Sequence, residues 1–399
     1  MDRDELGAWL RLTLSPGVGN GAARSLLARF GMPQPIFEQP EAALRECVTS
    51  AQARALLTVP ENWVALRDAT WQWLTEAAPP GTARAIVTLG DARYPQSLLA
   101  TEDPPLLLYL VGAPELLAKL PFPETRCLAV VGSRNPTGQG AENARLFARA
   151  LRGAGLTIVS GLALGVDAAA HEGALEAPGG ATTTAGSGNG NGALAPATIA
   201  VVGTGLDRVY PRKNLDLAHR IAQRGLLVSE YPLGTPPIAA NFPKRNRIIS
   251  GLSQGTLVVE AALASGSLIT ARMAAEQGRE VFAIPGSIHA PQSRGCHALI
   301  RQGAKLVESA QDVLEELRWP VAGGSATVAD IGDVHESASE ATPETALLQA
   351  LGFDPVGLDA LIGRTGMDAA SLQVQLLELE LAGHVARLPG GLFQRTASA

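Results

Sequence analysis

One pattern repeats along the middle of the chain, from Thr125 to about Arg318. Each repeat has a short apolar run, a glycine-bearing turn and a stretch with helical spacing. The apolar runs are CLAVVGS, LTIVSG, TIAVVGTG, LLVSEY, TLVVEA and EVFAIPG. Near-continuous apolar strands that alternate with helices are typical of a parallel sheet covered on both faces. The pattern therefore predicts a doubly wound α/β domain, whose ligands bind where strand carboxyl ends lead into helices.

Helical patterns flank this unit on both sides. LSPGVGNGAARSLLARFG (14–31) joins two helices through a Gly-rich turn, as in a helix-hairpin-helix. Such a turn predicts either backbone contacts to a phosphate or plain helical packing.

Residues 344–395 give three helical patterns and a hairpin around Pro389-Gly390-Gly391, the order of a winged helix. Its candidate recognition helix has no Lys or Arg and carries Glu378 and Glu380, which favours a protein-interaction module over a DNA reader.

Two polar stretches divide the chain further. Residues 178–196 are rich in Gly, Ser, Thr and Asn, which predicts a flexible surface insert, and 321–343 has the composition of an interdomain linker. The predicted division has four parts: a helical domain at 1–79, the sheet domain at 80–318, a linker at 319–342 and a winged helix at 343–399.

Composition narrows the class of protein. With 46% hydrophobic and 18% charged residues, the chain is an ordinary globular one, and its 399 residues predict several domains. No apolar run approaches the roughly 20 residues of a membrane helix, and the N-terminus lacks a signal core, so we expect a cytoplasmic protein without a membrane partner.

Three scattered cysteines predict core thiols rather than a metal site. The net charge of -6 argues against a cation-coated duplex DNA binder, so any nucleic-acid site is local.

The first two strand ends carry candidate anion sites. Gly132 permits a tight turn after the first strand, and Arg134 adds a planar fork for phosphate oxygens. After the second strand, Ser160 and Gly161 offer a hydroxyl and close-approach N–H groups. The chain lacks both G-x-G-x-x-G at these turns and G-x-x-x-x-G-K-[ST], so no nucleotide cofactor is expected.

Asp167 and His171 follow at i, i+4 in the next helical stretch. This spacing suits a catalytic or metal pair, but no third ligand is in sight, so a local hydrogen-bonded pair near the helix start is favoured.

A basic segment, NFPKRNRIIS (241–250), predicts a nucleic-acid contact. Asn241 is a plausible N-cap and the helix is expected from Pro243 to Gly251, so Lys244 and Arg247 share one face. Phe242, just outside the helix, is free to stack on a base. The alternative is a solvated basic face with a buried Phe; the first interpretation is favoured because the cations coincide with the ligand edge of the sheet.

These motifs together resemble the DprA/Smf family, DNA-processing protein A of bacteria. The resemblance spans about Leu89 to Arg318 and includes VVGSR, SGLALGVDAAAH, GTGLDRVYPRKN, NFPKRNRIISGLS and VVEAALASGSLITARMA. It implies an extended Rossmann-like domain that binds single-stranded DNA and loads the RecA recombinase onto it in natural transformation. It also implies a homodimer through the sheet domain and a sterile-alpha-motif-like N-terminal domain, while the 178–196 insert departs from the common pattern.

The resemblance assigns a set of DNA-binding residues and no catalytic or metal-binding residue. These residues are Gly132, Ser133, Arg134, Ser160, Gly161, Phe242, Lys244, Arg245, Asn246 and Arg247. The rival hypothesis is an enzyme, because 250–267 also resembles the signature of nucleotide phosphoribohydrolases, with Glu260 catalytic and Arg272 a substrate clamp. Ser253-Gln254 breaks that signature and no general base stands out, so we expect no enzyme; Glu260 then serves to orient the basic helix.

Overall fold

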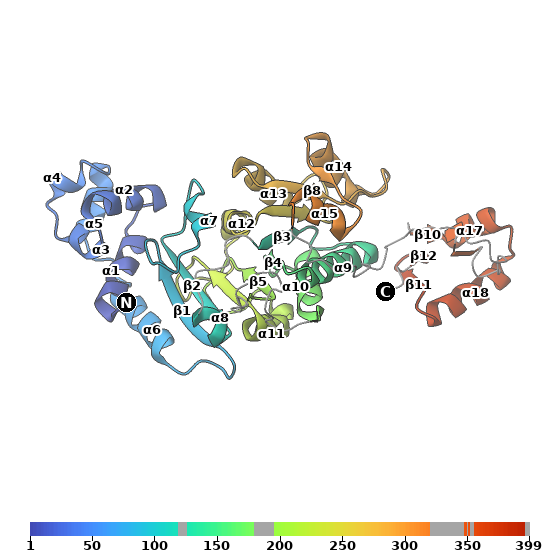
Figure 1. Cartoon of the computed structure of the whole chain (residues 1–399), viewed down its shortest axis with the longest axis horizontal. Helices are drawn as coiled ribbons and strands as arrows, with labels where there is room; N and C mark the ends of the chain where they lie inside the picture. The colour runs from blue at the N-terminus through green and yellow to red at the C-terminus, as the bar shows by residue number, and fades with distance from the viewer. Residues whose placement is uncertain (119–125, 179–194, 320–346, 349, 352–354, 396–399) are drawn as a thin grey trace.

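The computed structural model describes residues 1–118, 126–178, 195–319, 347–348, 350–351 and 355–395 (Figure 1). The predicted flexible insert, apart from its ends, and the predicted linker, apart from 319, lie outside these residues. Among the described residues, no helix combines the length and apolar character needed to cross a membrane.

A nine-stranded sheet forms the centre of the molecule, in the order β1-β2-β6-β5-β4-β3-β7-β8-β9. All neighbouring pairs from β6 to β9 are parallel, so the carboxyl ends of β3 to β8 share one edge. The doubly wound α/β class is confirmed, and the six predicted strands are β3 to β8. The bounds are β3 Cys127–Val131, β4 Thr157–Ser160, β5 Thr198–Val201, β6 Leu226–Ser229, β7 Gly255–Val258, β8 Glu280–Ala283 and β9 Lys305–Leu306.

Two strands precede the repeat that the sequence pattern identified. β1 (Ala83–Thr88) pairs antiparallel with β2 (Leu107–Gly112), and β2 pairs antiparallel with β6. They form an antiparallel end on a mostly parallel sheet. Their connection is a loop with one short helix rather than the repeated crossover, which is why the strand-turn-helix pattern does not include them.

Side chains of the central strands alternate between two apolar layers. On β3, Cys127, Ala129 and Val131 belong to one core cluster, and Leu128 and Val130 to the other. The first layer is covered by α7 (Gln96–Leu99), α8 (Pro114–Ala118), α12 (Asn241–Gly251), α13 (Ser267–Glu276) and α14 (Arg294–Arg301). The second is covered by α9 (Gly138–Gly153), α10 (Val166–Glu176), α11 (Leu215–Arg224) and α15 (Ala310–Glu316). Cys127 and Cys296 are buried in the first layer, as expected of core thiols.

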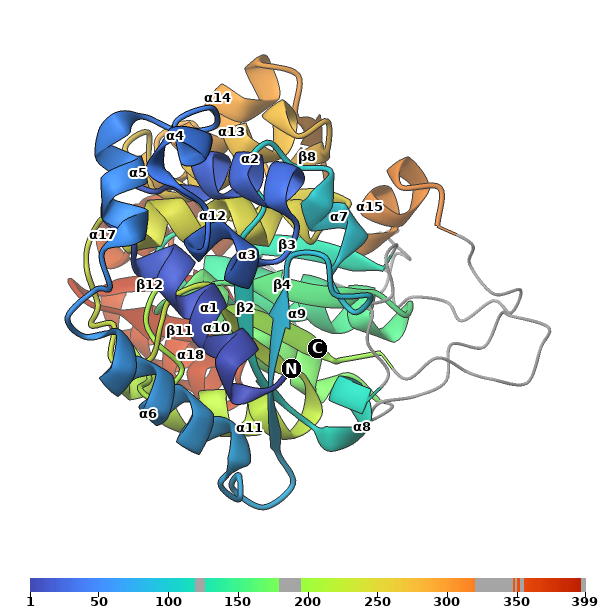
Figure 2. The same ribbon diagram turned by 90° about the vertical axis from the view of Figure 1, so that its left-hand side faces the viewer.

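The N-terminal helices pack on the antiparallel end of the sheet, and Figure 2 shows them in front of it. They are α1 Arg3–Leu14, α2 Asn20–Phe30, α3 Pro33–Phe37, α4 Glu41–Leu44, α5 Ser50–Leu57 and α6 Trp63–Thr75. Trp9 and Leu10 share one buried cluster with Ile86 and Tyr109 of β1 and β2. The helical module and the sheet therefore have a continuous core on this side; the boundary at 79/80 stays a prediction.

The C-terminal elements form a winged helix, which confirms that part of the fold prediction. A three-stranded sheet in the order β10-β12-β11 accompanies the helices, and β11 and β12 pair antiparallel across the Pro389-Gly390-Gly391 turn. The bounds are β10 Val356–Gly357, α17 Leu358–Thr365, α18 Ala369–Leu381, β11 Val385–Leu388 and β12 Leu392–Arg395.

Candidate nucleic-acid interface

The loops after β3, β4 and β5 meet the start of α12 at the carboxyl edge of the sheet. Glycine is required where two of these loops touch. A Cβ at Gly132 would lie 2.7 Å from Val166 Cγ2, and Gly165 has φ +79° with the Ser133 carbonyl oxygen 2.5 Å from where its Cβ would be. Backbone segments therefore pack closely against one another at this edge, where doubly wound sheets bind their ligands.

The carboxylate of Glu260 fills the first predicted phosphate site. It accepts hydrogen bonds from Thr137 N at 2.9 Å and Thr137 Oγ1 at 2.5 Å, at the N-terminus of α9. A Cβ at Gly140, in the first turn of α9, would collide with this carboxylate. An anion already stabilises the positive end of this helix dipole. The expectation that Glu260 orients the basic helix was wrong, because it holds α9 instead of α12.

Asp167 fills the second predicted phosphate site. Its Oδ2 accepts hydrogen bonds from Gly161 N at 3.1 Å and Ala163 N at 3.3 Å. Ser160 is fully buried and its hydroxyl donates to the Val130 carbonyl at 2.7 Å. The N–H group of Gly161 and the hydroxyl of Ser160 are thus engaged within the protein, contrary to the sequence prediction.

His171 does not pair with Asp167, so the expected i, i+4 hydrogen bond is absent from the described contacts. Its Nδ1 lies 2.7 Å from Thr198 Oγ1, and burial lowers the pKa of His171 to about 3. Across the ranges that the structure describes, no group of three His, Cys, Asp or Glu side chains could hold a metal ion. His171 is a neutral core residue.

The basic helix α12 begins two residues earlier than the sequence suggests. Ala240 is the N-cap, and the side chain of Asn241 donates from Nδ2 to the Gly203 carbonyl at 3.1 Å rather than capping. Phe242 consequently lies in the first turn and not outside the helix. The end at Gly251 is as predicted, and Ile248 and Ile249 face the core.

Arg245 points into the protein, and its side chain is 5% exposed. It donates from Nη1 to the Val201 carbonyl at 2.5 Å, and Nη2 lies 4.0 Å from Asp167 Oδ2. Gly161 has no room for a Cβ because this guanidinium lies against it. Burial lowers the pKa of Arg245 and raises the pKa of Asp167. The opposite charge of the partner shifts each pKa the other way, but burial is the larger effect. The prediction of Arg245 as a surface contact was wrong, since it supports the β4–α10 loop from beneath.

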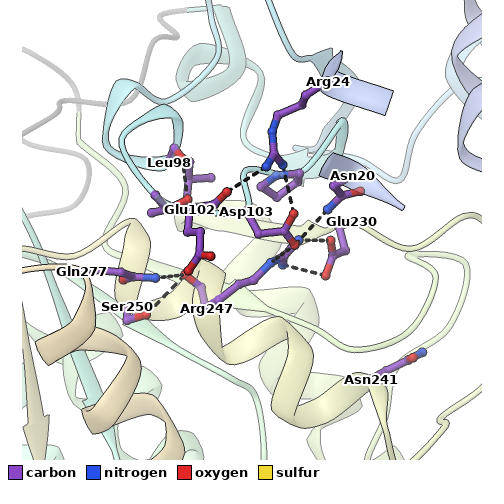
Figure 3. Close-up of polar contacts among 12 residues, drawn as sticks. Asn20, Arg24, Leu98, Glu102, Asp103, Glu230, Asn241, Arg247, Ser250 and Gln277 are labelled. Carbon is purple, nitrogen blue, oxygen red and sulfur yellow. Dashed lines mark hydrogen bonds and ion pairs between the residues drawn. The ribbon is translucent and has the colours of Figure 1, made fainter. Parts of the chain in front are cut away.

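Arg247 belongs to an ion-pair network that joins α12 to the N-terminal helices (Figure 3). Nη1 and Nη2 form a two-pronged bond to Glu230 at 2.8 and 2.6 Å, and Nε donates to Asp103 Oδ2 at 3.0 Å. Asp103 in turn accepts from Arg24 Nη1 at 3.0 Å and Asn20 Nδ2 at 3.2 Å, both on α2.

This network satisfies all the nitrogen atoms of the Arg247 guanidinium. Burial by itself would lower the pKa of Arg247. The neighbouring carboxylates of Glu230 and Asp103 together have the larger effect, so the pKa is raised. The prediction that Arg247 shares an open face with Lys244 was wrong, because only 11% of the Arg247 side chain is exposed. Asn20 and Arg24 belong to the predicted helix-hairpin-helix (14–31), and both bind Asp103 within the protein. Of the two interpretations of that segment, these contacts favour helical packing over phosphate binding.

Two of the predicted site cations, Arg134 and Lys244, remain open at this edge. Both are exposed, and Lys244 has no hydrogen-bond or ion-pair partner among the described residues. Phe242 lies near Arg134, whose Cζ is 5.7 Å from the ring centroid. Ser133 and Asn246 are half-buried; Ser133 Oγ accepts from Asn135 N at 3.1 Å, and Asn246 Nδ2 donates to the Gly266 carbonyl at 3.4 Å.

Sequence reasoning missed one aromatic residue here. Tyr210, in the loop after β5, packs on Phe242 with ring centroids 5.6 Å apart. The sequence signal was present, because VYPRKN places one aromatic residue just before two cations.

Comparisons with known proteins agree with this fold. A family model described as DNA recombination-mediator protein A matches residues 85–318, and one described as DprA winged helix domain matches 335–391. Protein Smf of Escherichia coli is 41% identical over 345 residues, which are 86% of this chain and 84% of that protein. DNA processing protein DprA of Streptococcus pneumoniae is 47% identical over 229 residues, which are 57% of this chain and 73% of that protein. The X-ray structure of DNA processing protein A from Streptococcus pneumoniae matches with a TM-score of 0.61 and 36% identity, over 79% of this chain and 98% of that one.

Proposed function

Because the chain belongs to the DNA recombination-mediator protein A family, we propose that it binds single-stranded DNA at the carboxyl edge of its sheet. We further propose that it loads the RecA recombinase onto that strand in natural transformation. This is a DNA-processing role in the cytoplasm, without a chemical step on the nucleic acid.

The observation that carries the proposal is the pairing of exposed cations with an aromatic cluster. Arg134 lies against Phe242, and Lys244 is exposed two residues further along α12. Glu260 and Asp167 already accept hydrogen bonds from the backbone N–H groups of the two predicted phosphate sites. A small phosphate ligand would have to compete with those two carboxylates. A strand lying across the outside of the edge would meet the open cations and the aromatic faces, which is how single strands are held with little sequence preference.

A binding titration at several salt concentrations tests this proposal. We expect fluorescent oligo-dT to bind more tightly than duplex DNA or AMP. Arg134→Ala and Lys244→Ala should each weaken binding and flatten the log–log salt dependence by about 0.7 per lost phosphate contact. Arg149→Ala is the matched control, because Arg149 is exposed near the other end of α9. Equal affinities of the three variants would overturn the proposed site.

Phe242 should behave differently from the cations. Removing its ring in Phe242→Ala leaves the charge count alone, so affinity should fall with the salt slope unchanged. A thermal melt of the same variant separates this from a folding defect.

An exposed apolar surface favours the proposed homodimer. Leu263 is 60% exposed and Leu306, on the short edge strand β9, is 44% exposed. Leu263 and Leu306 line a shallow groove together with Ile300 of α14. Apolar side chains gathered at a sheet edge are typical of an interface. Sedimentation of the wild type and of Leu306→Glu tests it: we expect a dimer that the substitution dissociates.

A further inference from the structure

Tyr210 is the most exposed aromatic side chain among the residues that the structure describes, at 47%. Phe242 beneath it is half-buried and has neighbours on several sides. The Tyr210 ring is tilted 37° to it, the Arg134 guanidinium lies over it, and a Cβ at Gly203 would come within 3.2 Å of Phe242 Cδ1. Tyr210 is therefore the outer ring of the cluster and offers more open aromatic surface than Phe242.

The loop that carries Tyr210 is anchored on both sides. Before it, Asp207 Oδ1 accepts a hydrogen bond from Gly234 N at 2.8 Å. After it, the buried Asn214 donates from Nδ2 to the carbonyls of Leu162 and Ala163 at 2.9 and 3.2 Å. A ring held in place loses little conformational entropy when a base stacks on it.

Two cations follow Tyr210 after Pro211. Arg212 and Lys213 are exposed, and neither has an ion-pair partner within the described parts of the chain. They lie two and three residues after Tyr210, close enough along the chain to serve the phosphates that flank a base stacked on its ring. By contrast, Arg208, before the ring, is bound to Asp207 at 2.8 Å.

We propose that Tyr210, Arg212 and Lys213 form a second nucleotide subsite, which takes an unpaired base on the Tyr210 ring and its phosphates on the two cations. This inference rests on the proposed function and extends the DNA path from Phe242 and Lys244 to the loop after β5. Phe242 supports the Tyr210 ring from beneath.

Binding of oligo-dT and of an abasic strand of equal length tests the subsite. We expect Tyr210→Ala to weaken oligo-dT binding about 5- to 150-fold, with an unchanged salt slope and an unchanged melting temperature. Tyr210→Phe keeps the flat ring and should retain affinity. Tyr210→Leu keeps apolar contact with Phe242 but has no flat face, so it should lose affinity like Ala. None of these variants should differ from the wild type on the abasic strand, and Arg212→Ala should flatten the salt slope.

The outcomes separate this inference from the proposed function. If the wild type fails to bind oligo-dT, the proposed function fails, and the subsite with it. If the wild type binds and Tyr210→Ala binds equally well, the subsite alone is overturned. An equal loss on both strands would also overturn it, because Tyr210 would then act by shaping the edge and not by stacking.

Discussion

At the scale of single residues, the cations of α12 have different roles although they lie within four positions. Lys244 is exposed, Arg245 lies under the β4–α10 loop, and Arg247 binds Glu230 and Asp103. Helical geometry turns successive residues by about 100°, so neighbours on the chain meet different surroundings. Only the first of the three remains available to a phosphate.

Arg247→Ala should therefore reduce stability. It leaves the Glu230 carboxylate, whose side chain is 7% exposed, without its two-pronged partner. Removing one partner of a buried ion pair lowers the free energy of unfolding by about 3–5 kcal/mol. Lys244→Ala should change it by less than about 0.5 kcal/mol. Urea denaturation measures both.

Two controls sharpen this test. Arg247→Lys should not rescue stability, because an ammonium cannot reproduce the fork on Glu230. The double substitution Arg247→Met with Glu230→Met should recover part of the loss, since no lone charge stays buried. An Arg247→Ala variant that melts like the wild type but no longer binds oligo-dT would restore Arg247 as a DNA ligand.

At the scale of elements, the N-terminus of α9 is the point where the binding and enzyme hypotheses differ. The Glu260 carboxylate is bonded to Thr137, and a Cβ at Gly140 would collide with it. A catalytic carboxylate must instead be free to contact a substrate or a water. Glu260 has the contacts of a structural helix cap.

We therefore expect wild-type protein incubated with AMP to release no adenine, as followed by chromatography. Glu260→Ala should lower the free energy of unfolding by about 1–2 kcal/mol, because α9 loses the anion at its N-terminus. Thr137→Ala is a matched control that removes one of the same hydrogen bonds. Adenine release that disappears in Glu260→Ala would establish the hydrolase instead.

At the scale of the whole molecule, the two terminal modules relate differently to the proposed DNA edge. The N-terminal helices share a core with β1 and β2 and reach α12 through Arg24 and Asp103. The winged helix exposes apolar and acidic side chains on α18: Val374 at 57%, Leu377 at 55% and Leu381 at 82%, with Glu378 also exposed. Such a face suits protein contact better than phosphate contact.

Deleting residues 343–399 should consequently leave most of the oligo-dT affinity intact, as measured by the same titration. Deleting residues 1–79 should instead lower the melting temperature, because it exposes Ile86 and Tyr109 and removes Arg24 from Asp103. Loss of oligo-dT binding in the first truncation, with an unchanged melt of the remaining chain, would contradict the protein-contact interpretation of α18.

Local pattern was sufficient for much of this protein. The six central strands follow from runs of apolar residues, and the winged-helix hairpin follows from Pro389-Gly390-Gly391, because periodicity and turn chemistry act over a few residues. The location of the candidate site at the strand carboxyl ends follows from the parallel order of the sheet. Arg134 and Lys244 could be identified in this way, since they remain exposed.

Which polar groups stay available was decided only by the tertiary structure. Arg247 meets Asp103 across 144 positions of sequence, and Glu260 meets Thr137 across 123. No local pattern encodes such partners, because they come together only when distant elements pack. The same packing buries Arg245 behind Gly161 and sets Tyr210 on Phe242. The sequence thus determined the helices and strands and the edge of the sheet at which a ligand is expected to bind. Long-range burial and charge pairing determined which side chains at that edge face the solvent.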